Sequence, residues 1–446
     1  MSKDTNSKYL YGASVQGIQE FIFATNRLKE IVGASELIKQ ISQDFKKYGA
    51  DEILVNAAGN IKAIFNSKEA CEKVVLEFSK EIQQKAYGIT ISQTVVAFEA
   101  NHTQNDINTL EKNLKIQRNK PSTPLDISLN IMKLNPSTAN PLINKESDSA
   151  TAQKLKAYAS IENSEEFKDL KDISNSKNKL AVIHIDGNAL GEVIRNLKTP
   201  LSEFSTNLEN ATREAFSKAK QDKHVREIIL GGDDVTLICN ANDALSFTKE
   251  FLESFEEETQ VQVGLRLTAC AGIAYTNDKY PFHYAVSLAE VLCGVAKNHS
   301  KRKASSLMFH NIQSSNFQTW DKFVQDELTI KNDKETIRAD FGAYSLSESK
   351  PLITDLRNIV ESLRVKESPS SKLRTWLGEL YKSSEYAQNF LDRVDSMADI
   401  NPKYSKKILN KNFKSLHEEL SLNNLIVEKK TPIHDILKIL SVTEAK

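Results

Sequence analysis

The sequence predicts an α+β protein in which two ferredoxin-like units occur in tandem and are followed by a C-terminal helical bundle. Three observations support this prediction. A strand, turn, helix, hairpin, helix and strand pattern occurs twice, apolar residues recur at helical spacing near the C-terminus, and 446 residues suffice for more than one core. The expected boundaries are 5–120 and 176–312 for the two units, 121–175 for a linker or small insert, and 316–446 for the bundle.

The two units correspond position by position, which indicates an internal duplication. The strand, glycine-containing turn and helix predicted over 9–22 match the stretch around Asp186, and residues 57–66 match 231–240 at nearly the same offset. The aligned pairs are Ser14 with Asp186, Gln16 with Asn188, Gly59 with Asp233, Asn60 with Asp234, and the strand 89–98 with 265–275.

Residues 227–239 predict a tight β-hairpin in the second unit. Two β-rich apolar runs flank the corner Gly231-Gly232-Asp233-Asp234, and glycine at such a corner permits backbone angles that other residues avoid. Neighbouring carboxylates repel each other unless a cation lies between them. Asp233 and Asp234 therefore favour a divalent metal site with oxygen ligands, as magnesium or manganese prefers. The alternative is an ordinary exposed turn, because glycine and aspartate are common turn residues.

A second stretch strengthens the metal interpretation. Residues 180–186 form a nearly continuous apolar run that ends at Asp186, which is the pattern of a central strand buried on both faces. A glycine-containing turn over 187–191 then leads into a helix predicted over 192–197. An aspartate at the end of a central strand, beside a carboxylate hairpin, is the layout of a palm domain that holds two metal ions for phosphoryl transfer.

The stretch 186–191 together with the Gly231–Asp234 corner resembles the cyclase palm of the large subunit of type III CRISPR effector complexes, which is itself similar to GGDEF cyclases. The resemblance implies a nucleotidyltransferase that joins ATP into a cyclic oligoadenylate or related messenger. Asp186, Asp233 and Asp234 would be its catalytic ligands for Mg²⁺ or Mn²⁺. The family often has a second aspartate where this chain has Asn188, whose amide can coordinate or hydrogen-bond but brings no charge. The nucleotide-binding residues expected around these ligands are Gly187, Asn188, Gly231 and Gly232.

The first palm is expected to be a degenerate partner. Its aligned positions hold Ser14, Gly59 and Asn60, and none of these is a carboxylate that could hold two divalent ions. The resemblance implies that nucleotides bind between a degenerate and an active palm. Donor ATP is then expected on the aspartate side, and the acceptor near Gln16, Gly17, Gly59 and Asn60. That acceptor could be ATP, a growing oligoadenylate or another adenosine-bearing molecule such as S-adenosylmethionine.

Two further stretches could contact phosphate, and each has a purely structural alternative. Residues 33–37 resemble a stretch that opens a helix in the family's first palm, and the start of a helix could accept phosphate. The alternative is that these small residues allow close packing of helices. A helix predicted over 281–298 ends near Lys297, which resembles the phosphate-contacting lysine of GGDEF and CRISPR palms. We expect Lys297 to contact phosphate and the cations 301–303 to be a solvated helix end.

Composition excludes several other classes. Lys plus Arg and Asp plus Glu both total 59, so a nucleic-acid contact would need a local basic patch. The cysteines show no C-x-x-C spacing, which argues against a zinc ribbon and a disulfide framework. No run approaches the roughly 18–20 apolar residues of a membrane span, and residues 1–8 do not resemble a signal peptide. We therefore expect a cytoplasmic protein that does not bind membranes.

The remaining segments predict less specific structure. Prolines break up the insert over 121–175, which lacks the cysteines that hold zinc in the family, so apolar packing is expected to hold it if it folds. Two apolar stripes at helical spacing predict the C-terminal bundle. Lysines at 403, 406, 407, 411 and 414 surround Tyr404 and Phe413; a solvated surface is favoured there over an RNA contact.

Three functions remain open from the sequence. The leading one is the ATP-condensing enzyme, working with other CRISPR effector subunits, guide RNA and target RNA as the resemblance implies. The second is a catalytically silent, structural and RNA-binding subunit, motivated by Asn188. The third is a standalone cyclic-nucleotide synthase. A diguanylate cyclase fits less well, because that family usually lacks a degenerate second palm. His434-Asp435 is an isolated dipeptide, so the HD nuclease domain that often opens the family is expected to be missing.

Overall fold

The computed structural model describes residues 7–57, 59–99, 102–120, 129, 131–161, 167, 169–197, 199–313, 319–331, 335–347, 349–365, 369–398 and 406–445. The chain divides into two compact units. The first comprises Met1–Asp169, Val193–Glu209 and Pro281–His283, and the second comprises Leu170–Glu192, Asn210–Tyr280 and Tyr284–Lys446.

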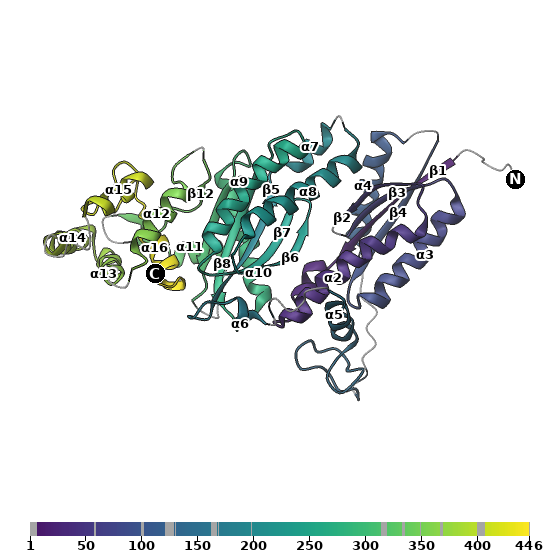
Figure 1. Ribbon diagram of the computed structural model, residues 1–446, viewed down its shortest axis with the longest axis horizontal. Coiled ribbons are helices and arrows are strands. Elements are labelled where there is room, and N and C mark those ends of the chain that lie inside the picture. Colours follow the sequence, from purple (N-terminus) through teal and green to yellow (C-terminus); the bar gives the residue numbers. More distant parts are fainter. Residues whose placement is uncertain are drawn as a thin grey trace. The chain divides into compact units, whose positions relative to one another are not determined.

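The first unit contains a four-stranded antiparallel sheet in the order β2-β3-β1-β4 (Figure 1). This order and the connections between the strands are those of a ferredoxin-like fold. The strands are β1 (Ser7–Gln16), β2 (Glu52–Ala57), β3 (Asn60–Phe65) and β4 (Thr90–Glu99). The helices are α1 (Ile18–Phe23), α2 (Leu28–Asp44), α3 (Lys68–Lys85), α4 (Gln104–Arg118) and α5 (Ser149–Ala159), with a 3₁₀ turn η1 (Phe45–Tyr48).

Strand β1 shows how this sheet is held between helices. Alternate residues of a strand point to opposite faces, so Leu10 packs with Leu110 and Leu114 of α4 on one face. Tyr11 packs on the other face against Phe45, with ring centroids 5.8 Å apart. The hydrophobic core therefore lies on both sides of the sheet.

The second unit repeats this arrangement within a larger sheet of order β12-β9-β8-β5-β7-β6. All its pairs are antiparallel except β8 with β9. The strands are β5 (Lys179–Gly187), β6 (Val225–Gly231), β7 (Asp234–Asn240), β8 (Ala269–Asn277), β9 (Ser306–Asn311) and β12 (Tyr344–Ser345). The helices that belong wholly or partly to this unit are α6 (Leu170–Ile173), α7 (Leu190–Arg195), α8 (Leu201–Lys220), α9 (Ala244–Gln262) and α10 (Phe282–His299), and α7, α8 and α10 also contribute residues to the first unit. Helix α7 thus begins two residues before its predicted start at 192.

The strand register agrees with the proposed duplication at the key positions. The order β8-β5-β7-β6 matches β4-β1-β3-β2, Ser14 pairs with Asn60, and Asp186 pairs with Asp234. The predicted match of 89–98 with 265–275 is shifted. The structure pairs Ser92 with Ser14 and Cys270 with Asp186, so Ser92 corresponds to Cys270. That shift is two residues, so each side chain keeps its face of the sheet.

Helix α10 lies unusually close to β8. A Cβ atom added to Gly272 would lie 1.9 Å from the Ala289 carbonyl oxygen and 2.5 Å from the Cys293 nitrogen, and both of these atoms belong to the α10 backbone. Only a residue without a side chain permits this approach. Gly272 therefore sets the distance between the sheet and the helix that carries Lys297.

We expect Gly272→Ala to lower the free energy of unfolding by about 3 kcal/mol or more, because backbone atoms would have to move. Gly294→Ala is the matched control: Gly294 lies inside α10 with open space at its Cβ position. That change should raise stability by about 0.5–1 kcal/mol, since alanine favours helices. Urea unfolding followed by circular dichroism measures both, and equal stabilities of the two variants would contradict the close approach.

One prediction in the first unit needs correction. Gly33 lies within α2 rather than at a helix start, and an added Cβ would lie 1.9 Å from the Lys154 carbonyl oxygen of α5. The stretch 33–37 therefore serves close helix packing, and its phosphate-binding interpretation is wrong.

Hydrogen bonds organise the described part of the insert that precedes α5. Asp148 is 1% exposed and accepts from Asn135 Nδ2 and Thr138 Oγ1, both at 2.7 Å, and from the Thr151 backbone nitrogen at 2.9 Å. Ile131, in contrast, is 91% exposed. The apolar contacts of the described insert come from α5, whose Ala150 and Ala157 are buried, whereas the loop before α5 is held by the Asp148 hydrogen bonds.

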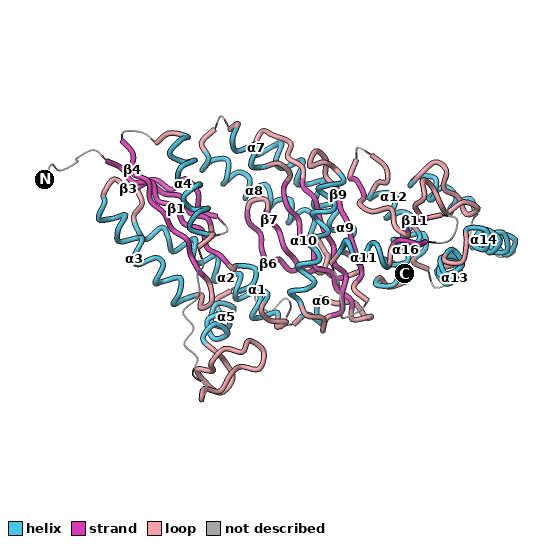
Figure 2. Tube along the Cα trace, turned by 180° about the vertical axis from the view of Figure 1, so that it is seen from behind, coloured by secondary structure: helices cyan, strands magenta, loops and turns pink. Residues whose placement is uncertain are grey.

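The C-terminal region is mainly helical, as predicted (Figure 2). Leu373, Trp376 and Leu380 form the buried stripe of one helix. Three short strands were not foreseen, and β12 joins the edge of the large sheet beside β9. The additional elements are α11 (Trp320–Asp326), β10 (Thr329–Lys331), β11 (Thr336–Arg338), α12 (Ile353–Leu363), α13 (Ser370–Leu380), α14 (Ser384–Ala398), α15 (Lys406–Leu416) and α16 (Ile433–Val442).

The lysine-rich segment of α15 resembles a solvated helix face. Lys411 and Lys414 are exposed, whereas Phe413 is buried and unavailable for stacking on a base. Lys403 and Tyr404 lie outside the described residues, as do the side chains at 406 and 407. Within the described part of the chain, no helix is both long and apolar enough to span a bilayer.

Candidate active site

Asp186 and the carboxylate hairpin meet at one end of the second sheet. Strand β5 is central, and its Asp186 pairs with Asp234 at the start of β7. The hairpin turn contains only Gly232 and Asp233, because Gly231 pairs with Asp234. Gly232 has φ +59°, which fits a two-residue hairpin with glycine in the first turn position. The structure thus brings together the three predicted aspartates.

Gly187 allows the hairpin tip to lie against the end of β5. A Cβ atom at this position would lie 2.9 Å from the Asp233 Cβ atom and 2.6 Å from Leu190 Cδ1. The Gly187 nitrogen donates to the Asp233 carbonyl oxygen at 3.2 Å. The glycine predicted at the nucleotide site therefore positions the turn in this structure.

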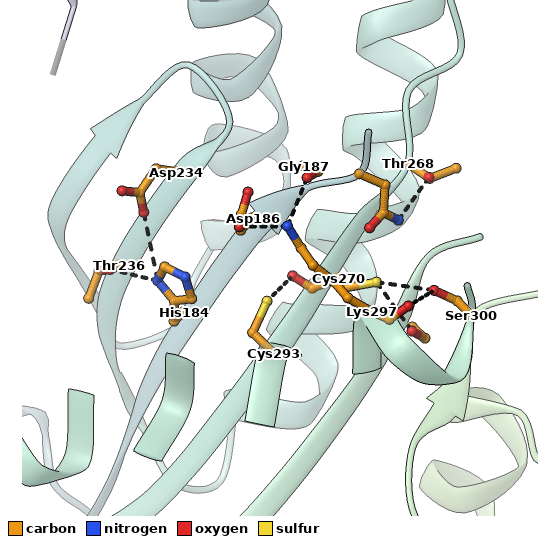
Figure 3. Close-up of polar contacts among 12 residues, drawn as sticks. His184, Asp186, Gly187, Asp234, Thr236, Thr268, Cys270, Cys293, Lys297 and Ser300 are labelled. Atoms are coloured by element: carbon orange, nitrogen blue, oxygen red, sulfur yellow. Dashed lines mark hydrogen bonds and ion pairs between the residues drawn. The ribbon is translucent and has the colours of Figure 1, made fainter. Parts of the chain in front are cut away.

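Lys297 reaches the same site from α10. Its Nζ atom lies 2.5 Å from Asp186 Oδ2 and 3.0 Å from the Gly187 carbonyl oxygen (Figure 3). The lysine side chain is 8% exposed, whereas the Asp186 side chain is 39% exposed. Lys297 is therefore a fixed cation beside a carboxylate that solvent can reach. The cations 301–303 are exposed after the end of α10, as the solvated-end interpretation predicts.

The carboxylates strongly affect one another. Burial raises the pKa of Asp234 to about 7, and the charges of Asp186, Asp233 and Glu290 add to the rise. Burial and the charge of Asp186 also raise the pKa of Asp233, while Lys297 opposes both shifts. Carboxyl groups in such surroundings are stabilised as anions by an added cation.

Sequence reasoning missed two side chains that support the hairpin. His184 lies two residues before Asp186, and its Nδ1 atom is 3.2 Å from Thr236 Oγ1 and 3.7 Å from Asp234 Oδ1. Burial lowers the pKa of His184 to about 4, so the ring is neutral at neutral pH. Thr212 Oγ1 donates to the Gly232 carbonyl oxygen at 2.5 Å. The two-residue period of β5 could have indicated His184, whereas Thr212 has no comparable sequence signal.

Asn188 is buried beside the site. Its Nδ2 atom donates to Thr268 Oγ1 at 2.9 Å and to the Ala304 carbonyl oxygen at 3.2 Å. Its Oδ1 atom is buried without a hydrogen-bond partner among the described residues. The Asn188 amide nitrogen thus links the turn after β5 to the segment after α10, and the amide oxygen remains available to a ligand.

We expect Asn188→Asp to lower the free energy of unfolding by about 1–3 kcal/mol in EDTA, because a carboxylate cannot donate to Ala304. Mn²⁺ should reduce this loss if the new carboxylate joins Asp186 at a metal ion. Urea unfolding of the variant and of the unchanged protein, each with EDTA and with Mn²⁺, measures the difference. The same loss under both conditions would place Asn188 outside the metal site.

The donor set fits a hard divalent ion. All candidate ligands are oxygens, and both Asp234 Oδ1 and Asn188 Oδ1 are buried without a hydrogen-bond partner in the described structure. The described residues contain no group of three or more His, Cys, Asp or Glu side chains close enough to hold a metal. The cation that contacts Asp186 in this structure is the Lys297 ammonium.

The four predicted acceptor residues gather at one corner of the first sheet. Gly17 precedes α1 with φ +73°, Gly59 has φ +77°, and the Val15 nitrogen donates to the Gly59 carbonyl oxygen at 2.9 Å. Asn60 is exposed and Gln16 is half-buried. Their role in binding an acceptor stays a prediction.

Comparison with known proteins agrees with the palm fold. Residues 179–306 match the family model described as Cas10/Cmr2, second palm domain. The fold of the whole chain is similar to that of Csm1 from T. onnurineus, at a TM-score of 0.56 and 13% identity, over 98% of this chain and 70% of that one. These findings support a Cas10-like large subunit. No curated protein matches the chain.

Other Cas10-like structures with ligands have the same fold. A Csm1–Csm4 cassette in complex with AMPPNP matches at a TM-score of 0.56 and 13% identity, covering 98% of this chain and 70% of that chain. A Csm1–Csm4 cassette in complex with cA4 matches at a TM-score of 0.56 and 11% identity, covering 98% and 69%. At these identities the likeness establishes the fold.

Proposed function

We propose that this Cas10-like chain is a metal-dependent nucleotidyltransferase that converts ATP into a cyclic oligoadenylate or related adenosine-containing messenger in type III CRISPR defence. The observation that carries the proposal is the convergence of Asp186, Asp233, Asp234 and the Lys297 ammonium at one end of a Cas10/Cmr2-type palm sheet. The ATP-analogue and cA4 complexes of the neighbouring structures agree with an adenine nucleotide as substrate.

The reaction joins a ribose hydroxyl oxygen of the acceptor to the α-phosphorus of the donor ATP. The bond from that phosphorus to the β-phosphate bridging oxygen breaks, pyrophosphate leaves, and the hydroxyl proton passes to solvent. Asp186, Asp233 and Asp234 would hold Mg²⁺ or Mn²⁺, which lowers the pKa of the attacking hydroxyl and neutralises the leaving group when bound.

Lys297 has two roles in this proposal. An ammonium has three N–H donors, and two of them are used by Asp186 and the Gly187 carbonyl oxygen. These bonds fix the Asp186 carboxylate at the end of β5. The third N–H remains for an oxygen of the triphosphate, whose charge a fixed cation stabilises.

The finer assignments extend this proposal. We infer that the acceptor binds near Gln16, Gly17, Gly59 and Asn60. We also infer that the chain works with another effector subunit, because the neighbouring structures are Csm1–Csm4 cassettes. Guide RNA and target RNA are proposed as partners of that assembly.

Incubation of the purified chain with ATP and either Mn²⁺ or Mg²⁺, followed by mass spectrometry, tests the proposal. Products with linked adenosines should form with metal and be lost with EDTA. The assay is repeated with the reconstituted RNA-guided complex, so that a requirement for partners does not mask activity. Absence of product in every condition would overturn the proposal and favour the silent, RNA-binding subunit.

A further inference from the structure

A cavity of about 520 Å³ lies at the end of the second sheet opposite the carboxylates. It is bounded by the start of α9, by α12 and by α16, all in the second unit, and Tyr275 of β8 contributes to its lining. Tyr275 pairs with Ala181, five residues before Asp186 on β5, which corresponds to about 17 Å along the strand. The cavity is therefore separate from the candidate active site.

The start of α9 supplies unpaired backbone donors to this cavity. The helix runs for 19 residues, and its N-cap, Asp243, makes no side-chain capping bond. Leu245 and Ser246 of the first turn line the cavity. The first N–H groups of a helix carry a partial positive charge and are suited to an anion.

Two arginines of α12 add positive charge. Arg364 lines the cavity and is anchored by Glu361 at 2.8 Å and by the Glu444 carbonyl oxygen at 2.9 Å. Arg357 also lines it, is half-buried, and makes no hydrogen bond or ion pair within the described structure. A half-buried guanidinium without a partner favours binding of an anion.

The acidic groups at the cavity are already engaged. Glu361 pairs with Arg364, and Asp243 Oδ2 accepts from the His224 nitrogen at 3.3 Å. The two carboxylates and the two arginines give these groups no net charge, and Arg357 is the one among them that makes no hydrogen bond or ion pair within the described structure.

Tyr275 provides an independent indication of a ligand. The residue is 0% exposed, and its hydroxyl has no hydrogen-bond partner among the described residues. A buried hydroxyl without a partner is unfavourable, and a ligand oxygen would satisfy it. The Arg364 charge opposes the large rise that burial causes in the Tyr275 pKa, so the hydroxyl lies within the influence of that arginine.

We propose that this cavity binds the phosphate group of a small ligand. The first turn of α9 and Arg357 hold the anionic oxygens, Tyr275 donates its hydroxyl proton, and Arg364 completes the positive wall. Inorganic phosphate and a nucleotide monophosphate share this chemistry. The proposal does not depend on the activity of the carboxylate site.

Binding of ³²P-orthophosphate to the full chain in EDTA, measured by equilibrium dialysis, tests the site without metal. We expect Arg357→Gln to weaken binding at least about tenfold and Tyr275→Phe to weaken it several-fold, as expected for charged and neutral hydrogen bonds. Arg374→Gln is the matched control, because Arg374 is exposed on α13 and away from the cavity; it should bind like the unchanged protein.

Unfolding measurements separate binding from structure. Tyr275→Phe should keep the unfolding midpoint in phosphate-free buffer, because the hydroxyl that it removes has no partner, and should lose the stabilisation that phosphate gives. Tighter binding of AMP than of phosphate would identify a nucleotide as the source, and equal binding would identify phosphate alone. No phosphate binding by the unchanged chain, or equal binding by all three variants, would overturn the proposal.

Discussion

Replacing Asp233 and Asp234 together by alanine should abolish formation of linked-adenosine products while the protein stays folded. Both side chains lie at the hairpin tip, and the Asp234 side chain is 42% exposed although its Oδ1 atom is buried. Little packing is lost, and the burial of the two carboxylates and their repulsion by Asp186, which together raise the pKa of both groups, no longer oppose folding. Without two of three metal ligands, product formation should fall by at least about three orders of magnitude.

The test compares products by mass spectrometry and unfolding by circular dichroism. Asp222→Ala is a suitable control, because Asp222 is exposed in the turn before β6, at the other end of the hairpin. It should leave both measurements unchanged. Normal turnover by a folded double variant would show that the chemistry takes place elsewhere.

The second large effect is expected for Lys297→Met. The variant removes the bonds to Asp186 Oδ2 and to the Gly187 carbonyl oxygen, as well as the N–H left for a phosphate oxygen. We expect the rate of ATP conversion at limiting ATP to fall about a hundredfold, as for loss of the charged hydrogen bond to phosphate and of the one that fixes Asp186. Affinity for Mn²⁺ should rise, because no ammonium then competes for the Asp186 carboxylate.

The rate of ATP conversion and the affinity for Mn²⁺ together distinguish a functional role of Lys297 from a purely structural one. If Lys297 only supports packing, its loss should disturb the carboxylates and lower both ATP conversion and Mn²⁺ affinity. Mn²⁺ affinity can be followed by electron paramagnetic resonance without turnover. Lys303→Met is the control, since Lys303 is exposed shortly after the same helix. A fall in both quantities for Lys297→Met would contradict the proposed competition.

The local features of the site could be predicted from the sequence. The hairpin and the strand before Asp186 depend on apolar runs and on glycine at a turn, and these act over a few residues. The pairing of Lys297 with Asp186 joins positions more than a hundred residues apart, so the sequence indicates the lysine but not its partner. The contacts of Asn188 with Thr268 and Ala304 are hidden for the same reason.

The features that the sequence did not reveal also depend on contacts between residues that are not neighbours in the chain. The Asp148 carboxylate organises the loop of the insert through side chains whose positions are not periodic, so the sequence pattern did not reveal these contacts. Gly33 was compatible with a helix start or with close packing, and only the position of α5 decides between them. Strand β12 has two residues, too few to show an alternating pattern, and it forms by pairing with β9.

That pairing changes where the second palm ends. The boundary predicted at 312 would cut the chain after β9 and remove β12, which pairs with Leu307 and Ser306. Every residue of β9 is buried, so the truncated fragment would expose Leu307, Met308 and Phe309 together with the backbone groups that β12 pairs with. Exposed strand edges associate with other strands and cause aggregation. The C-terminal region thus covers part of the edge strand of the palm sheet. A fragment designed to contain the second palm has to extend through β12.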